Sequence, residues 1–137
     1  MSVRTEQHTL GVEEEYQIVD PGTRELRDHG GGVLQRARQI VGEGEGVASE
    51  LLTSQVEAMT PVLSTLSEVR AELRRLRCEV SEAAEEQGDR IVAAGTHPFS
   101  RWQEQTITPG SITRGSSTTT SRWPTSSSRS GFTCTWG

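Results

Sequence analysis

The chain has 137 residues, enough for one small domain with a core if all of it takes part. Only 31% of the residues are hydrophobic and the mean hydropathy is -0.56, which is low for a compact globular protein. The net charge of -5 argues against a nucleic-acid partner, although a local basic patch stays open. The N-terminus has no apolar core typical of a signal peptide, and no apolar run reaches the roughly 18 residues that span a membrane. A cytoplasmic protein with no membrane partner is therefore expected.

The composition changes sharply near Pro109. All nineteen acidic residues lie before it, whereas fifteen of the twenty-eight residues from 110 to 137 are Ser or Thr. Residues 1–109 are therefore predicted to fold, and residues 110–137 to form a disordered tail. The two cysteines, Cys78 and Cys134, form no metal or redox motif.

The first elements are predicted from residue patterns before position 60. Residues 9–19 resemble a strand, and "DPGTREL" at 20–26 is typical of a turn. A short helix is expected over 33–41, ended by Gly42. Residues 49–60 predict a second strand.

A long helix is the clearest of the expected elements. Thr60 and Pro61 fit an N-cap and a first helical position, and Gly88 fits a C-terminal cap. The apolar residues between them form one helical stripe, which either packs on a sheet or pairs with a partner helix. The helical stripe comprises Leu66, Val69, Leu73, Leu76, Val80 and Ala83.

After the long helix, a buried strand is expected over 89–95.

Three consecutive glutamates interrupt the first predicted strand, in "GVEEEY". Alternate side chains of a strand lie on opposite faces, so Glu13 and Glu15 share a face and Glu14 lies on the other. If the second strand pairs with the first, Glu57 can join them. Carboxylate oxygens are ligands that Mg²⁺ prefers, often together with substrate phosphates. The alternative is that these glutamates simply lie on a solvated face.

"GTHPFSRWQEQ", residues 95–105, is the second unusual stretch, and it follows a predicted strand. His97 either donates a hydrogen bond to a phosphate or carboxylate, or braces the loop before Pro98. No P-loop, dinucleotide-binding, zinc or nucleophile-elbow motif is present in the sequence.

"TLGVEEEYQIVDP", "ELLTSQVEAMTPV" and "RIVAAGTHPFSRWQEQTITP" together resemble the type 2 glutamate–cysteine ligases, also called carboxylate–amine ligases, over residues 8–109. The resemblance implies the N-terminal part of a glutamine-synthetase-like catalytic domain, of α+β class, with an antiparallel sheet and helices packed on one side. It implies that ATP, Mg²⁺, glutamate and an amine such as cysteine are bound, and that γ-glutamylcysteine forms through an acyl phosphate, as in glutathione biosynthesis.

The same resemblance implies roles for individual residues. Glu13, Glu15 and Glu57 would be metal ligands, while Thr96, His97 and Arg101 would lie at the edge of the substrate and ATP site. The catalytic residues are not identified, and homo-oligomer formation stays open.

The tail departs from the family, which continues with a helix and a His-Val-His-Val-Gly strand. Read in the neighbouring frame, the codons of residues 131–137 are compatible with that motif. We therefore expect a frameshift near Pro109 or Gly110 and a truncated, inactive and only partly folded product. The alternative is a non-catalytic protein that associates through the Leu66–Ala83 stripe. A Ca²⁺-binding module is disfavoured, because no loop alternates Asp or Asn ligands around a central Gly.

Overall fold

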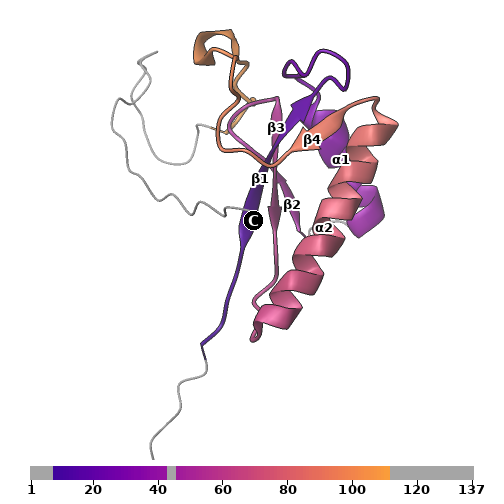
Figure 1. Ribbon diagram of the computed structural model, residues 1–137, viewed down its shortest axis with the longest axis vertical. Coiled ribbons are helices and arrows are strands. Elements are labelled where there is room, and N and C mark those ends of the chain that lie inside the picture. The colour runs from indigo at the N-terminus through magenta and orange to yellow at the C-terminus, as the bar shows by residue number, and fades with distance from the viewer. Residues whose placement is uncertain (1–7, 43–45, 112–137) are drawn as a thin grey trace, which may run out of the picture.

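The computed structural model describes residues 8–42 and 46–111. They form two layers, a sheet and a pair of helices packed on one of its faces (Figure 1). The α+β class and the helices on one side of an antiparallel sheet are thereby confirmed. The elements in chain order are β1 (Glu13–Val19), α1 (Gly30–Val41), β2 (Val47–Ser49), β3 (Gln55–Met59), α2 (Leu66–Glu86), β4 (Arg90–Val92) and a 3-10 turn, η1 (Trp102–Glu104).

The four strands have the order β2-β3-β1-β4, and every neighbouring pair is antiparallel. The central strand β1 is shorter than predicted, because the chain before Glu13 forms no regular ladder: Leu10 makes an isolated bridge with Leu63, and Val12 bonds partly to the Thr60 side chain. The single second strand predicted over 49–60 was wrong. A turn divides that stretch, so that β2 and β3 form a hairpin.

A turn follows β1 as predicted, and the Asp20 side chain holds it together. Its Oδ1 accepts hydrogen bonds from the backbone amides of Gly22 and Thr23, both at 2.7 Å. This is the local pairing that makes aspartate common in turns.

Helix α1 begins at Gly30, three residues earlier than predicted. Gly30 lies against the turn between β2 and β3, which holds the first residue of the helix in place. The Gly30 amide donates to the Thr53 carbonyl at 2.7 Å, and a side chain there would collide with that backbone. The helix ends at Gly42 as expected, where φ is +110°.

The start predicted for the long helix was wrong by several residues. Thr65, not Thr60, is the N-cap of α2, and it forms a capping box in which the Glu68 amide donates to Thr65 Oγ1 at 3.2 Å. Gly88 follows the helix with φ +78°, as a C-terminal glycine should.

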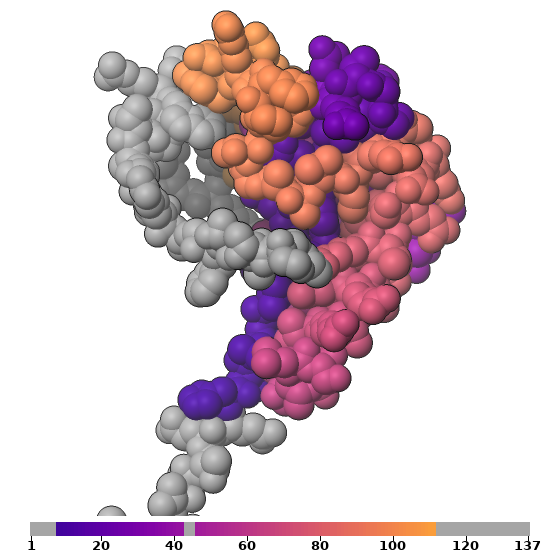
Figure 2. Space-filling model, viewed as in Figure 1, coloured from indigo at the N-terminus to yellow at the C-terminus, as the bar shows by residue number. Residues whose placement is uncertain are grey.

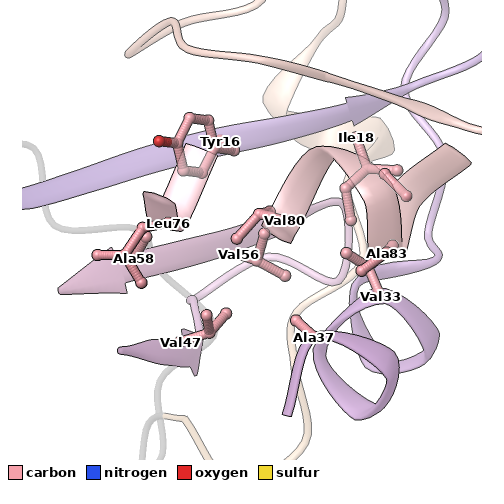
Figure 3. Close-up of a cluster of buried hydrophobic side chains, with 11 residues drawn as sticks. Tyr16, Ile18, Val33, Ala37, Val47, Val56, Ala58, Leu76, Val80 and Ala83 are labelled. Carbon is pink, nitrogen blue, oxygen red and sulfur yellow. The ribbon is translucent and has the colours of Figure 1, made fainter. Parts of the chain in front are cut away.

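The apolar stripe of α2 packs inside the protein, as the sheet-packing interpretation predicts. Figure 3 shows Leu76, Val80 and Ala83 facing the side chains of the strands and of α1. Leu66 is the exception, because it lies in the first turn and is 78% exposed. The core also contains Ala84 of α2 and residues from α1 and from every strand except β4: Tyr16, Ile18, Val33, Ala37, Val47, Val56 and Ala58.

A buried strand was predicted over 89–95, and the predicted burial was wrong. β4 is a short edge strand, and Val92 is 43% exposed. Other large apolar side chains among the described residues are exposed as well, including Leu10, Val62, Phe99, Trp102 and Ile107.

Most of the predicted tail, residues 112–137, lies outside the described residues. In the part of the chain that the structure describes, no helix has the length and apolar character needed to cross a membrane.

Gly30→Ala should destabilise the protein, because an ideal Cβ would lie 2.5 Å from the Thr53 carbonyl oxygen and 2.9 Å from that of Gln55. We expect a loss of about 1–3 kcal/mol in the free energy of unfolding, measured by urea denaturation. Gly31→Ala is the matched control, because its Cβ would meet no atom within 4 Å. It should be neutral or stabilise by up to about 1 kcal/mol, and equal effects of the two variants would contradict the close approach at Gly30.

Candidate functional site

The three glutamates of β1 are divided between the two faces of the sheet. Glu14 lies on the helix side, where Arg77 of α2 pairs with it through two nitrogens, with Nε to Oε2 at 2.8 Å. The Tyr16 hydroxyl donates to the same carboxylate. The hydrogen bond from Arg77 is the main cause that lowers the pKa of Glu14. Glu14 is therefore an ionised structural residue, and the alternation predicted from the sequence is confirmed.

Glu13 and Glu15 lie on the opposite face of β1, which the helices do not cover. Glu15 is directly opposite Glu57 of β3 in the antiparallel register, so the two carboxylates share this open face. The Gln55 amide donates to Glu15 Oε1. The structure thus brings Glu15 and Glu57 side by side, with Glu13 two residues along the same strand.

Glu50 is a fourth member of this acidic group, and the sequence interpretation missed it. Had 49–60 been one strand, Glu50 and Glu57 would lie on opposite faces, because they are an odd number of positions, seven, apart. The hairpin reverses the chain and pairs Ala48 with Glu57, which returns Glu50 to the open face. The polar pair Thr53–Ser54 was the local signal that could have indicated the turn. Glu13, Glu15, Glu50 and Glu57 are hereafter the carboxylate row.

The electrostatics of the carboxylate row are unfavourable without a cation. Burial raises the pKa of Glu15, and the carboxylates of Glu50 and Glu57 raise it further. Burial likewise raises the pKa of Glu57, followed by the charges of Glu50 and Glu13. Among the described residues, the ion pairs involve other acids, and none reaches the carboxylate row. This face carries concentrated negative charge that no ion pair with an arginine of residues 8–42 or 46–111 neutralises.

The donor chemistry of the row fits a hard divalent cation. Mg²⁺ is commonly held by one or two carboxylates, with water and substrate phosphates as the remaining ligands. Within residues 8–42 and 46–111, no three His, Cys, Asp or Glu side chains are placed to hold one ion together. The Glu15–Glu57 pair therefore fits a site that shares its ion with a phosphate, and it does not form an all-protein cage. The assignment of Glu13, Glu15 and Glu57 as metal ligands stays a prediction.

His97 is held by both ring nitrogens within its own neighbourhood. Nε2 lies 2.9 Å from the Arg24 carbonyl oxygen, and Nδ1 lies 3.1 Å from the Ser100 amide nitrogen. Because a carbonyl can only accept and an amide can only donate, the ring must be the neutral tautomer with its hydrogen on Nε2. Phe99 contacts the ring edge-on, with centroids 4.5 Å apart. This arrangement is the one expected if His97 braces the loop.

The other residues predicted at the site edge are exposed. Thr96 precedes His97, and Arg101 is the N-cap of η1. In the part of the chain that the structure describes, no hydrogen bond or ion pair joins Thr96, His97 or Arg101 to the carboxylate row. Figure 2 shows the segment that contains them (orange) beside the turn after β1 (violet). The two predicted groups of site residues are therefore not linked by polar contacts within the described residues, and their site role stays a prediction.

Comparison with known proteins identifies the family. The chain belongs to glutamate-cysteine ligase family 2, whose sequence model matches residues 9–116. This match begins next to the first residue of the resemblance and extends past the boundary predicted at Pro109.

Individual relatives agree with the family match. Proteins named "Putative glutamate--cysteine ligase 2" are 52% identical over 101 residues in Chloroflexus aurantiacus and 48% in Roseiflexus castenholzii, each alignment covering 74% of this chain. A protein of the same name from Sorangium cellulosum is 44% identical over 111 residues. These alignments cover 25%, 26% and 28% of the relatives, so the chain spans about a quarter of their length.

Glu57→Gln should stabilise the cation-free protein at pH 7 by about 0.2–1 kcal/mol, because it removes a like charge opposite Glu15. Since the pKa of Glu57 is raised above its ordinary value of 4.5, the folded state binds its proton more tightly than the unfolded state. The stability that Glu57 contributes should therefore be lost as the pH rises above about 4.5, so the advantage of the variant over the wild type should grow with pH in that range.

Urea denaturation at a series of pH values in the presence of a chelator measures both effects. Glu104→Gln, at an exposed glutamate in η1, is the control and should change neither. A variant that is less stable than the wild type at pH 7 would contradict the repulsion.

Proposed function

We propose that this chain forms the N-terminal part of the catalytic domain of an ATP-dependent carboxylate–amine ligase, with glutamate and cysteine as substrates. The observation that carries the proposal is the carboxylate row, an acidic face that lacks ion pairs within the described part of a chain belonging to glutamate-cysteine ligase family 2. The arrangement of the layers supports it, because the helices occupy one face of the sheet and leave the acidic face open. In this proposal the sheet is part of a glutamine-synthetase-like domain whose open face lines the active site.

The residues of the row would bind and orient the reactants. Glu15 and Glu57 would hold Mg²⁺ from adjacent strands, with Glu13 and Glu50 beside them. A bound Mg²⁺ supplies positive charge that offsets the charge of the triphosphate during phosphoryl transfer. Glu14 and Arg77, on the other face, would keep β1 in the register that holds Glu13 and Glu15 toward the substrates.

The proposed reaction makes an amide in two steps. The γ-carboxylate of glutamate attacks the γ-phosphorus of ATP and displaces ADP, which gives an acyl phosphate. The amine of cysteine then attacks the acyl carbon, phosphate leaves, and γ-glutamylcysteine forms. The donors that stabilise the transferring phosphoryl group would include residues from the parts of the relatives that this chain does not match.

The alternative, association through the Leu66–Ala83 stripe, has less support. Leu76, Val80 and Ala83 are fully buried against the sheet and α1, so a partner helix could reach them only if α2 left the core. A cytoplasmic location completes the proposal, and the oligomeric state is left open.

Mg²⁺ should stabilise the protein through the carboxylate row. At a concentration ten times its Kd, the ion should add about 1.4 kcal/mol to the free energy of unfolding. Glu15→Gln should lose most of that increment, because it removes a ligand and half of the opposing charge pair. Thermal and urea unfolding with and without Mg²⁺ measure the increment.

Glu14→Gln is the matched control for this prediction, because it alters the same glutamate run on the other face. It should lower the stability by weakening the contact with Arg77 and yet keep the full Mg²⁺ increment. Equal increments in the wild type and both variants would place the ion elsewhere and contradict the proposed site.

The 137 residues alone are expected to form no γ-glutamylcysteine, because they match only about a quarter of the relatives' length and leave the acidic face open. Incubation with ATP, Mg²⁺, glutamate and cysteine, followed by chromatography of the product, tests this. Product from the wild type would contradict the expectation of inactivity. If an identically prepared Glu15→Gln variant then forms none, the result would support the proposed chemistry.

A further inference from the structure

Gln17 is a buried polar residue on the same face of β1 as Glu13 and Glu15. Its side chain is covered, and the residue is only 3% exposed. Nε2 donates to the Ala94 carbonyl at 2.9 Å, just after β4. Oε1 is buried and has no hydrogen-bond partner among the described residues. Buried acceptors without a partner are uncommon in folded proteins, so this atom indicates a missing donor.

The orientation of the amide is fixed by its one partner. If the amide were turned over, Oε1 would face the Ala94 carbonyl and two acceptors would be opposed. The unpaired atom is therefore the oxygen, and the group that completes this site must supply a hydrogen.

The surroundings of Gln17 favour a donor with positive charge. Glu15 is two residues away on the same face, and Glu57 lies opposite Glu15. A primary ammonium group offers three N–H donors and a positive charge, which suits one amide oxygen beside several carboxylates.

We infer that Gln17 is a specificity-determining residue of the ligase proposed above: its Oε1 accepts a hydrogen bond from the ammonium group of an amino-acid substrate on the open face. The inference rests on the proposed function, which supplies the amino-acid substrates. Because Oε1 is covered in this structure, substrate entry requires the segment at Ala94 to shift outward. Among the described residues, the Gln17 side chain is joined to that segment by one hydrogen bond, from Nε2 to the Ala94 carbonyl, while its backbone pairs with Val92 in β4.

The test compares ligands with and without the amine, using the 137-residue protein, Mg²⁺ and a non-hydrolysable ATP analogue. L-Glutamate is paired with glutarate, and L-cysteine with 3-mercaptopropionate. Nitrogen-15 NMR follows the side-chain amide of Gln17 and gives each Kd. One of the two amino acids should bind at least about tenfold more tightly than its analogue without the amine, and it should shift the Gln17 signals. That amino acid is the substrate whose amine is recognised.

Gln17→Met removes the acceptor at similar length. It should weaken binding of that amino acid about tenfold and leave its amine-free partner unchanged, so that the preference disappears. Gln35→Met, at an exposed position on α1, is the control and should preserve the preference. If Gln17→Met does not fold, the comparison of ligands on the wild type decides alone.

The outcomes separate this inference from the proposed function. Equal affinities of both amino acids and their partners, with binding retained, would overturn the role of Gln17 and leave the ligase proposal standing. A preference that persists in Gln17→Met would do the same. Failure of the wild type to bind the nucleotide and every substrate would contradict both.

Discussion

The contact between Glu14, Tyr16 and Arg77 is the constraint on which the candidate site depends. It fixes the central strand to the long helix through a paired, ionised carboxylate on the helix side of the sheet. Because side chains alternate along a strand, a slip of one residue would exchange the two faces completely. The paired contact opposes that exchange, since it would move Glu14 away from Arg77. The position of Glu13 and Glu15 on the open face therefore follows from how Glu14 is held.

The open face has a cost that the rest of the fold must offset. Glu15 and Glu57 are cross-strand neighbours of like charge, and both have raised pKa values. By contrast, Glu14, Glu72, Glu79 and Glu86 each form an ion pair with an arginine, so cations are available elsewhere in the described strands and helices. Local charge repulsion kept in this way is typical of a surface adapted to bind rather than to stabilise.

Local patterns predicted much of the fold and long-range contacts determined the rest. The alternation in "GVEEEY", the helical stripe from Val69 to Ala83 and the glycine stops at Gly42 and Gly88 each need only a short window of sequence. The start of α2 was misplaced, because Thr60–Pro61 and Thr65–Glu68 both resemble helix starts. The latter satisfies two backbone donors through its capping box. Glu50 was missed because its face depends on the hairpin.

The motif around His97 shows where a family resemblance and a structure say different things. The resemblance implies a place at the site edge, whereas Nε2 of His97 joins the loop to the turn after β1 and Nδ1 accepts a hydrogen bond from Ser100 within the loop. A ring held in this way has no hydrogen-bonding atom left for a substrate. The conformation of the loop, rather than the ring itself, is therefore what His97 contributes. Gln17 holds the beginning of the same segment from the strand that carries Glu15, so a ligand that recruits Gln17 Oε1 would act on the loop and on the carboxylate row together.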